Sequence, residues 1–175
     1  MKIVVNPGHD KVLDPGAIGS TGLHEADVAH DVGKVLKTLL ESAGHEVKFL
    51  QDNFLMGVIN ESNAWGADIL VSIHCNGFAS PSAQGTETLY YPTSAQGKKL
   101  AECLQKSMVE TFALVDRGIK ERRDLGVLKY TSMPAALVEM AFITNPREEK
   151  ILRDGTQAWA RALYEGIKKY IESEV

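Results

Sequence analysis

The stretch "ADILVSIHCN", residues 67–76, is apolar from Ile69 to Ile73 apart from one serine, and a histidine follows directly. A short, nearly all-apolar run of this kind is typical of a strand that is buried on both faces of a parallel sheet. We therefore predict a buried strand over Asp68–His74, with His74 standing where the apolar run ends.

Further strands and helices alternate along the chain on both sides of this segment. The hydrophobic patterns predict strands at Lys2–Val5, Glu46–Leu50, Gly85–Tyr91 (as an edge strand), Gly126–Tyr130 and Ala135–Met140. Helical spacing predicts helices at Glu25–Ala43, Phe54–Trp65, Ser94–Phe112, a stretch opened by Pro146, and Asp154–Ile171. This alternation indicates an α/β fold whose sheet is covered by helices on both faces.

Length and composition indicate one ordinary globular domain. The chain has 175 residues, 44% hydrophobic and 24% charged, and neither a linker nor an internal repeat divides it. The net charge of -4 is spread along the sequence without a basic stripe, so we expect no nucleic-acid partner. Two cysteines do not make a disulfide framework.

No apolar run approaches the ~20 residues of a membrane span, and the N-terminus lacks the apolar region of a signal peptide. We therefore expect no membrane span. We expect one of two locations. The protein either stays in the cytoplasm until it is released from the cell, or it is the catalytic fragment of an exported protein.

Four ionisable residues are predicted to meet at one edge of the sheet. His9, His74 and Glu139 each stand where an apolar strand runs out, and Glu25 begins the helix that follows the His9 loop. In open α/β sheets, sites lie outside the carboxyl ends of the strands. The loop itself, "VVNPGHDKVLDPGA" from Val4, has two Pro-Gly clusters, which suggests that it is shaped to hold His9.

Two imidazoles and a carboxylate are the ligand set of a catalytic zinc ion that leaves one position for water. His9, Glu25 and His74 fit this set, and Glu139 is then free to act as the base of a hydrolysis. Each histidine could instead have a structural role, and Glu25 could simply stabilise a helix start. Glu139 is the hardest to explain structurally, because an unpaired carboxylate in an apolar strand is costly.

Several quoted motifs, taken together and in order, resemble the zinc-dependent N-acetylmuramoyl-L-alanine amidases of amidase type 3, found in bacterial cell-wall hydrolases, sporulation lysis enzymes and phage endolysins. The motifs are "NPGHDKVLDPGA", "GLHEADV", "ADILVSIHCN", "GTETLYY", "DRGIKERRDLGVL" and "MPAALVEMAFITNPREEKIL". The resemblance implies that residues 1–175 form a single catalytic domain with a twisted, mostly parallel sheet of about six strands.

The resemblance also implies roles for the same four residues. His9, Glu25 and His74 match the family's ligands for one zinc ion, and Glu139 matches its catalytic glutamate. The implied substrate is peptidoglycan, cleaved at the amide between N-acetylmuramic acid and L-alanine of the stem peptide, so the protein is expected to act at the cell wall. Relatives often have an arginine where this chain has Val58, and many carry a wall-binding module, which a longer parent chain could include.

Two other functions compete with an amidase activity. A peptidoglycan-binding module without turnover would have no reason to keep Glu139 together with all three ligands. A thiol hydrolase would use Cys75 with His74, but adjacent strand residues point to opposite faces. We therefore expect Cys75 to be a small buried hydrophobe.

Overall fold

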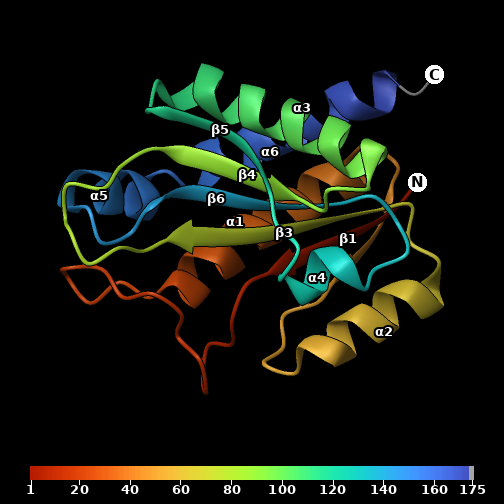
Figure 1. The fold of residues 1–175 in the computed structure, drawn as a ribbon, viewed down its shortest axis with the longest axis horizontal. Helices are drawn as coiled ribbons and strands as arrows, with labels where there is room; N and C mark the ends of the chain where they lie inside the picture. The colour runs from red at the N-terminus through yellow and green to blue at the C-terminus, as the bar shows by residue number, and fades with distance from the viewer. Residues whose placement is uncertain (174–175) are drawn as a thin grey trace.

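The computed structural model describes residues 1–173, and they form one six-stranded sheet in the order β2-β1-β3-β6-β4-β5 (Figure 1). All neighbouring strands are parallel except β4 and β6, which are antiparallel. The strands are β1 (Lys2–Pro7), β2 (Glu46–Phe49), β3 (Ile69–Asn76), β4 (Thr86–Tyr90), β5 (Asp116–Glu121) and β6 (Ala135–Phe142). The predicted α/β class with a mostly parallel six-stranded sheet is confirmed.

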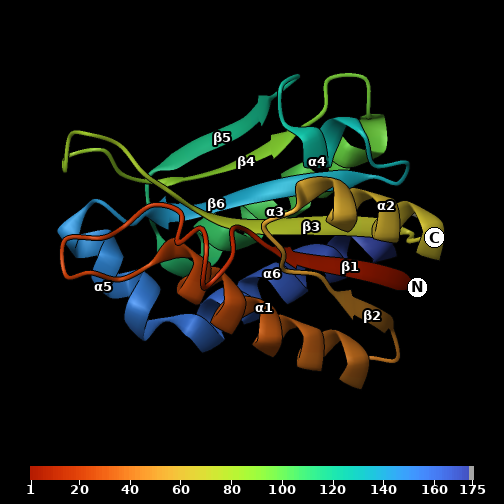
Figure 2. The same cartoon turned by 90° about the horizontal axis from the view of Figure 1, so that it is seen from below.

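Helices cover both faces of the sheet. They are α1 (Glu25–Ser42), α2 (Leu55–Trp65), α3 (Ala95–Phe112), α4 (Gly126–Lys129), α5 (Pro146–Asp154) and α6 (Thr156–Glu172). In Figure 2, α2 and α4 lie in front of the sheet and α3 and α6 lie behind it. None of the helices in residues 1–173 is both long enough and apolar enough to cross a membrane.

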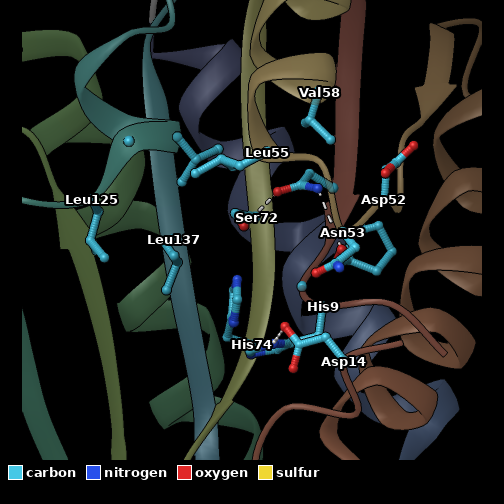
Figure 3. Close-up of a pocket in the computed structure, with 15 residues that line it drawn as sticks. His9, Asp14, Asp52, Asn53, Leu55, Val58, Ser72, His74, Leu125 and Leu137 are labelled. Carbon is cyan, nitrogen blue, oxygen red and sulfur yellow. Dashed lines mark hydrogen bonds and ion pairs between the residues drawn. The ribbon is translucent and has the colours of Figure 1, made fainter. Parts of the chain in front are cut away.

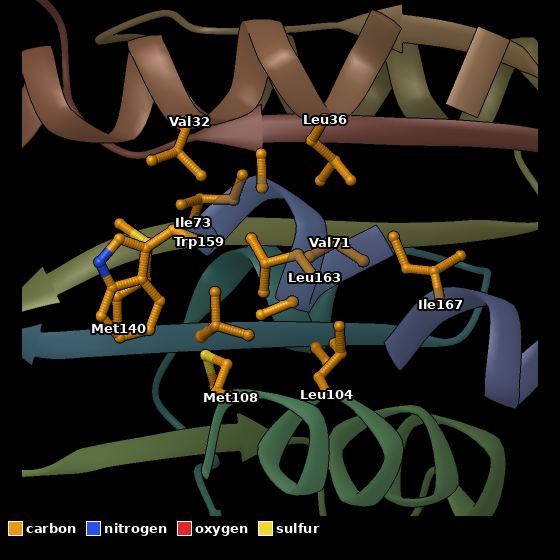
Figure 4. Packing of buried hydrophobic residues seen from close by; sticks show 14 of the residues in the cluster. Val32, Leu36, Val71, Ile73, Leu104, Met108, Met140, Trp159, Leu163 and Ile167 are labelled. Atoms are coloured by element: carbon orange, nitrogen blue, oxygen red, sulfur yellow. The ribbon is translucent and has the colours of Figure 1, made fainter. Parts of the chain in front are cut away.

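Strand parity divides the core into two layers, one on each face of the sheet. Figure 4 shows the larger layer, in which side chains of α1, α3 and α6 converge on Val71 and Ile73 of β3. The alternate residue Leu70 belongs to the smaller layer, together with Val127 and Leu128 of α4. Because alternate residues of a strand face opposite sides, His74 lies on the face of the smaller layer and Cys75 on that of the larger one.

Three predictions about individual elements were wrong. Gly126–Tyr130 is not a strand but the short helix α4, in which the adjacent residues Val127 and Leu128 are both buried. The strand β5 was not predicted, because its sequence DRGIKE is mostly polar and half-buried or exposed. We expected β4 at an edge of the sheet. Because β5 pairs with it, β4 is internal, and β2 and β5 form the two edges.

Candidate active site

A glycine lets the His9 loop lie directly against His74. The loop leaves β1 at Gly8, whose backbone N–H donates to the carbonyl of Ile73 at 2.8 Å. A Cβ atom on Gly8 would lie 2.2 Å from Cε1 of the His74 ring. Only a residue without a side chain therefore allows this close approach.

The second Pro-Gly cluster is packed just as closely. Gly16 has φ of +69°, and a Cβ there would lie 2.6 Å from both Oε2 of Glu25 and Cδ2 of His9. His9 itself has φ of 63°, in the left-handed region that side chains rarely adopt. Backbone strain of this kind persists only where the surrounding structure enforces it, and it is concentrated at functional sites.

His9, Glu25 and His74 meet at the carboxyl ends of β1 and β3, as predicted. Nε2 of His9 is 3.2 Å from Oε2 of Glu25, and Nδ1 of His74 is 2.9 Å from Oε1 of the same carboxylate. One ligand atom from each of the three residues lies within 4.8 Å of the others. Two nitrogens and a carboxylate oxygen at this spacing form a donor set that suits zinc.

Glu25 is almost completely buried but well supplied with hydrogen-bond donors. The backbone N–H groups of Ala17 and Cys75 donate to its two oxygens at 2.9 and 3.0 Å. Burial by itself would raise the pKa of Glu25, but the bonds from His74, His9 and Ala17 outweigh burial and hold this pKa well below its ordinary value. Glu25 is therefore an anion at neutral pH.

Asp14 orients His9, a contact that the sequence did not reveal. Oδ2 of Asp14 is 2.8 Å from Nδ1 of His9, so the Nε2 atom of the ring is directed toward Glu25. The bonds to Glu25 and Asp14 outweigh burial and raise the pKa of His9 to about 9 in the metal-free protein. A carboxylate on the far nitrogen of a ligating histidine is the usual arrangement at metal sites. The only sequence signal was the Asp-Pro-Gly turn, which indicated a loop shape rather than a partner.

Glu139 lies opposite His74 in the register of β3 and β6, on the same face of the sheet. Its Oε2 atom is buried and has no hydrogen-bond partner among residues 1–173. Burial raises the pKa of Glu139 to about 7, and the nearby Glu25 also favours the protonated form. The side chain is therefore a carboxyl group that can take or release a proton near neutral pH.

A second carboxylate, Glu87 of β4, lies opposite Glu139 in the antiparallel pairing of β4 and β6. Unlike Glu139, it is bonded to two cations, Arg117 and Lys120 of β5, and to the amide of Asn76. Burial acts to raise the pKa of Glu87, but the bonds from these two cations outweigh burial and lower it. Glu87 could not be singled out from the sequence, because its two cation partners lie on the unpredicted strand β5.

A cavity of about 210 Å³ adjoins His9 and His74 on the α2 and α4 side of the sheet. Figure 3 shows His74 and Asp14 at one end of it, Val58 at the other, and Leu125 and Asp52 on opposite sides. Val58 of α2 is thus part of the cavity wall.

Cys75 and the remaining histidines lie outside the cluster. The thiol is buried in the larger core layer, and burial raises the pKa of Cys75 well above its ordinary value. This contradicts the thiol-hydrolase interpretation, because a nucleophilic cysteine needs a lowered pKa and access to substrate. His24, His30 and His45 contact Asp27, Gln51 and the N-terminal amine respectively.

Comparison with solved structures shows the same fold in several amidases. The chain aligns with the N-acetylmuramoyl-L-alanine amidase AmiC2 of Nostoc punctiforme with a TM-score of 0.91 and 32% identity, covering 98% of this chain and 97% of that one. It aligns with an N-acetylmuramoyl-L-alanine amidase from Clostridium difficile with a TM-score of 0.89 and 29% identity, covering 99% and 98%.

Comparison with curated sequences gives longer relatives. The N-acetylmuramoyl-L-alanine amidase LytC of Bacillus subtilis is 35% identical over 96% of this chain, but the match spans only 35% of LytC. The probable cell wall amidase LytH of Staphylococcus epidermidis is 32% identical over 98% of this chain, which spans 58% of LytH. The sequence model of the family described as N-acetylmuramoyl-L-alanine amidase matches residues 3–169, and the chain therefore belongs to that family.

Proposed function

We propose that this chain is a zinc-dependent N-acetylmuramoyl-L-alanine amidase, with residues 1–175 as its catalytic domain. It would cleave the amide between N-acetylmuramic acid and L-alanine in peptidoglycan and act at the cell wall. Support comes from the family membership and from the convergence of His9, Glu25 and His74, with the unpaired Glu139 on the neighbouring strand. Since the chain spans only part of LytC and LytH, a wall-binding module in a longer parent chain is consistent with this proposal.

His9, Glu25 and His74 are the proposed ligands of one zinc ion. Two histidines and a glutamate are one of the ligand sets found at catalytic zinc sites, and with neutral imidazoles they would leave a bound Zn²⁺ with a net positive charge. Zinc held there supplies Lewis acidity, which activates water and polarises a carbonyl oxygen. Asp14 holds His9 with Nε2 directed into the cluster, so the site is organised before metal binds.

Glu139 is the proposed general base and acid. With a pKa near 7 and an oxygen without a partner, it can take the proton of the attacking water at Oε2. It then delivers this proton to the departing amine nitrogen of L-alanine. The second transfer is essential, because an unprotonated amine is a poor leaving group.

The direct test is mass spectrometry of peptidoglycan digested by the purified protein. We expect intact glycan strands and stem peptides with a free L-alanine amino group, and cleavage of glycosidic or peptide bonds instead would contradict the proposal. Glu139→Ala should keep its zinc yet lose turnover by about 100-fold or more, the usual size of general acid–base catalysis. A zinc-loaded Glu139→Ala protein with near-parent activity would exclude the proposed role of Glu139.

A further inference from the structure

A small antiparallel hairpin over residues 17–25 leads directly into the proposed ligand Glu25. At its base, the backbone N–H of Glu25 donates to the carbonyl of Ala17 at 3.0 Å. Nearer the tip, the N–H of Gly19 donates to the carbonyl of Leu23 at 2.8 Å. The N–H of Ala17 also donates to Oε2 of the Glu25 side chain at 2.9 Å. The position of the Glu25 carboxylate therefore depends on where this hairpin lies.

The tip of the hairpin is bound by Glu149 of α5, the helix that lies beside the N-terminal loop in Figure 2. The hydroxyl of Ser20 donates to Oε2 of Glu149 at 2.6 Å. The hydroxyl and the backbone N–H of Thr21 donate to Oε1 at 2.5 and 2.9 Å. Burial acts to raise the pKa of Glu149, but these bonds outweigh burial and lower it. Hydrogen bonds to an ionised carboxylate are stronger than those between neutral groups, so this contact is a firm anchor.

The backbone of the hairpin is fitted closely around this carboxylate. Glu149 is only 1% exposed, although Ser20 and Thr21 lie on the surface. A Cβ atom on Gly19 would lie 2.3 Å from Oε1 of Glu149. Gly19 does not have a positive φ, so glycine is needed here for space and not for an unusual backbone conformation.

The helix α5 is in turn fixed to β6, the strand that carries Glu139. Glu148, the neighbour of Glu149, is 2% exposed. Its two oxygens accept the backbone N–H groups of Phe142 in β6 and of Gly85 just before β4, each at 2.7 Å. The two adjacent carboxylates therefore connect the Glu25 hairpin to the strand of the proposed general base.

We propose that Glu149 is a positioning residue of the zinc site, which anchors the hairpin tip to α5 and thereby holds Glu25 in place for the metal. This inference rests on the proposed function, and Glu149 itself contacts neither the ligand cluster nor substrate. Without the anchor, the hairpin would adopt positions in which Glu25 is not aligned with His9 and His74. The apparent zinc affinity would then fall in proportion to the fraction of molecules that remain competent to bind.

The test compares zinc affinity, measured by chelator competition, in Glu149→Ala and Glu148→Ala. The two side chains are adjacent, carry the same charge and are almost equally buried, so both variants should lose unfolding stability. We expect zinc binding to weaken by about tenfold in Glu149→Ala, the lower end of the effect of groups that orient metal ligands. Glu148→Ala should bind zinc like the parent. An equal loss in both variants, or no loss in Glu149→Ala, would overturn the inference.

Surface variants test the same contact without a substitution in the core. The double variant Ser20→Ala/Thr21→Val removes two of the three donors to Glu149 from exposed positions and should weaken zinc binding several-fold. The control is Thr38→Val, which removes an exposed hydroxyl bonded only to the Lys34 carbonyl of its own helix and should leave zinc affinity unchanged. Unchanged affinity in the double variant would contradict the anchor.

Conservative variants separate the anchor from the charge of Glu149. In Glu149→Gln, the amide oxygen can keep both bonds from Thr21, and the amide N–H can donate to the Ser20 hydroxyl. Most of the zinc affinity should therefore return. Glu149→Asp keeps the charge but is one methylene shorter, so it should bind zinc more weakly than Glu149→Gln. The opposite order would show that charge, and not the anchor, is responsible.

Hydrogen exchange in the metal-free protein distinguishes this inference from the proposed function. The Ala17 amide, which donates to Glu25, should exchange faster in Glu149→Ala than in the parent and in Glu148→Ala. Faster exchange supports the anchor even if the parent fails to digest peptidoglycan, which would contradict only the proposed function. Conversely, digestion of peptidoglycan by the parent, with unchanged exchange and zinc affinity in Glu149→Ala, would overturn only the inference.

Discussion

Replacing Glu139 by glutamine should stabilise the metal-free protein at alkaline pH. Burial raises the pKa of Glu139 from 4.5 to about 7, so the folded state binds more protons than the unfolded state between these two values. Stability therefore falls as pH rises through this window and stays reduced above it. At about 1.4 kcal/mol per pKa unit, the ionised carboxylate costs up to about 3 kcal/mol at pH 8.

Glutamine has the same shape but cannot ionise, so it avoids this cost while keeping the packing. Urea unfolding of parent and Glu139→Gln proteins, with chelator present, should show a gain in unfolding free energy of up to about 3 kcal/mol at pH 8. Close to pH 5, where the carboxyl is protonated in the folded state, the gain should fall below about 1 kcal/mol.

The matched control is Glu102→Gln. This substitution removes the same charge from an exposed position on α3. Its unfolding free energy should change little at either pH. The explanation would be refuted if Glu139→Gln were no more stable than the parent at pH 8, or if its gain were the same at both pH values. Either result would mean that the Glu139 carboxylate is adequately solvated or paired in the folded protein.

Three further predictions concern the metal cluster and its surroundings. His74→Ala should lose zinc measured by atomic emission, whereas His45→Ala should retain it; full zinc content in His74→Ala would contradict the ligand assignment. Cys75→Ser should keep most peptidoglycan cleavage but lose about 1–3 kcal/mol of unfolding free energy from burying a hydroxyl in an apolar layer, and inactivation of a folded, zinc-loaded variant would contradict this. Gly16→Ala should lower unfolding free energy by about 1–3 kcal/mol and weaken zinc binding in a chelator competition, because its Cβ would collide with Glu25; unchanged affinity would show that the loop can shift freely.

The sequence predicted the central strands and the residues at their ends because both depend on simple periodicity. The apolar runs that end at His74 and Glu139 are long enough to identify buried strands, and strand parity then fixes the face of each side chain. This is why His74 was expected on the opposite face from Cys75, as the structure shows. The convergence of Glu25 and His9 followed from their places at a helix start and a strand end.

Elements without a strong apolar pattern could not be predicted in the same way. β5 is an edge strand whose residues are all half-buried or exposed. The helix α4 has only four residues, which is too short to show a helical period. The contact between Asp14 and His9 depends on the exact backbone path of a strained loop. Such a path is determined by packing against Glu25 and His74, which local sequence does not describe.

The contrast between Glu87 and Glu139 shows what these unpredicted elements contribute to the chemistry. The two carboxylates lie opposite each other on neighbouring strands, yet their pKa values move in opposite directions. The difference arises largely from β5, whose Arg117 and Lys120 pair with Glu87, whereas Oε2 of Glu139 has no hydrogen-bond partner among residues 1–173. A carboxylate that is fully paired stays ionised, whereas an unpaired buried one can exchange a proton near pH 7. The polar edge strand therefore helps to separate a structural carboxylate from the one proposed to carry out proton transfer.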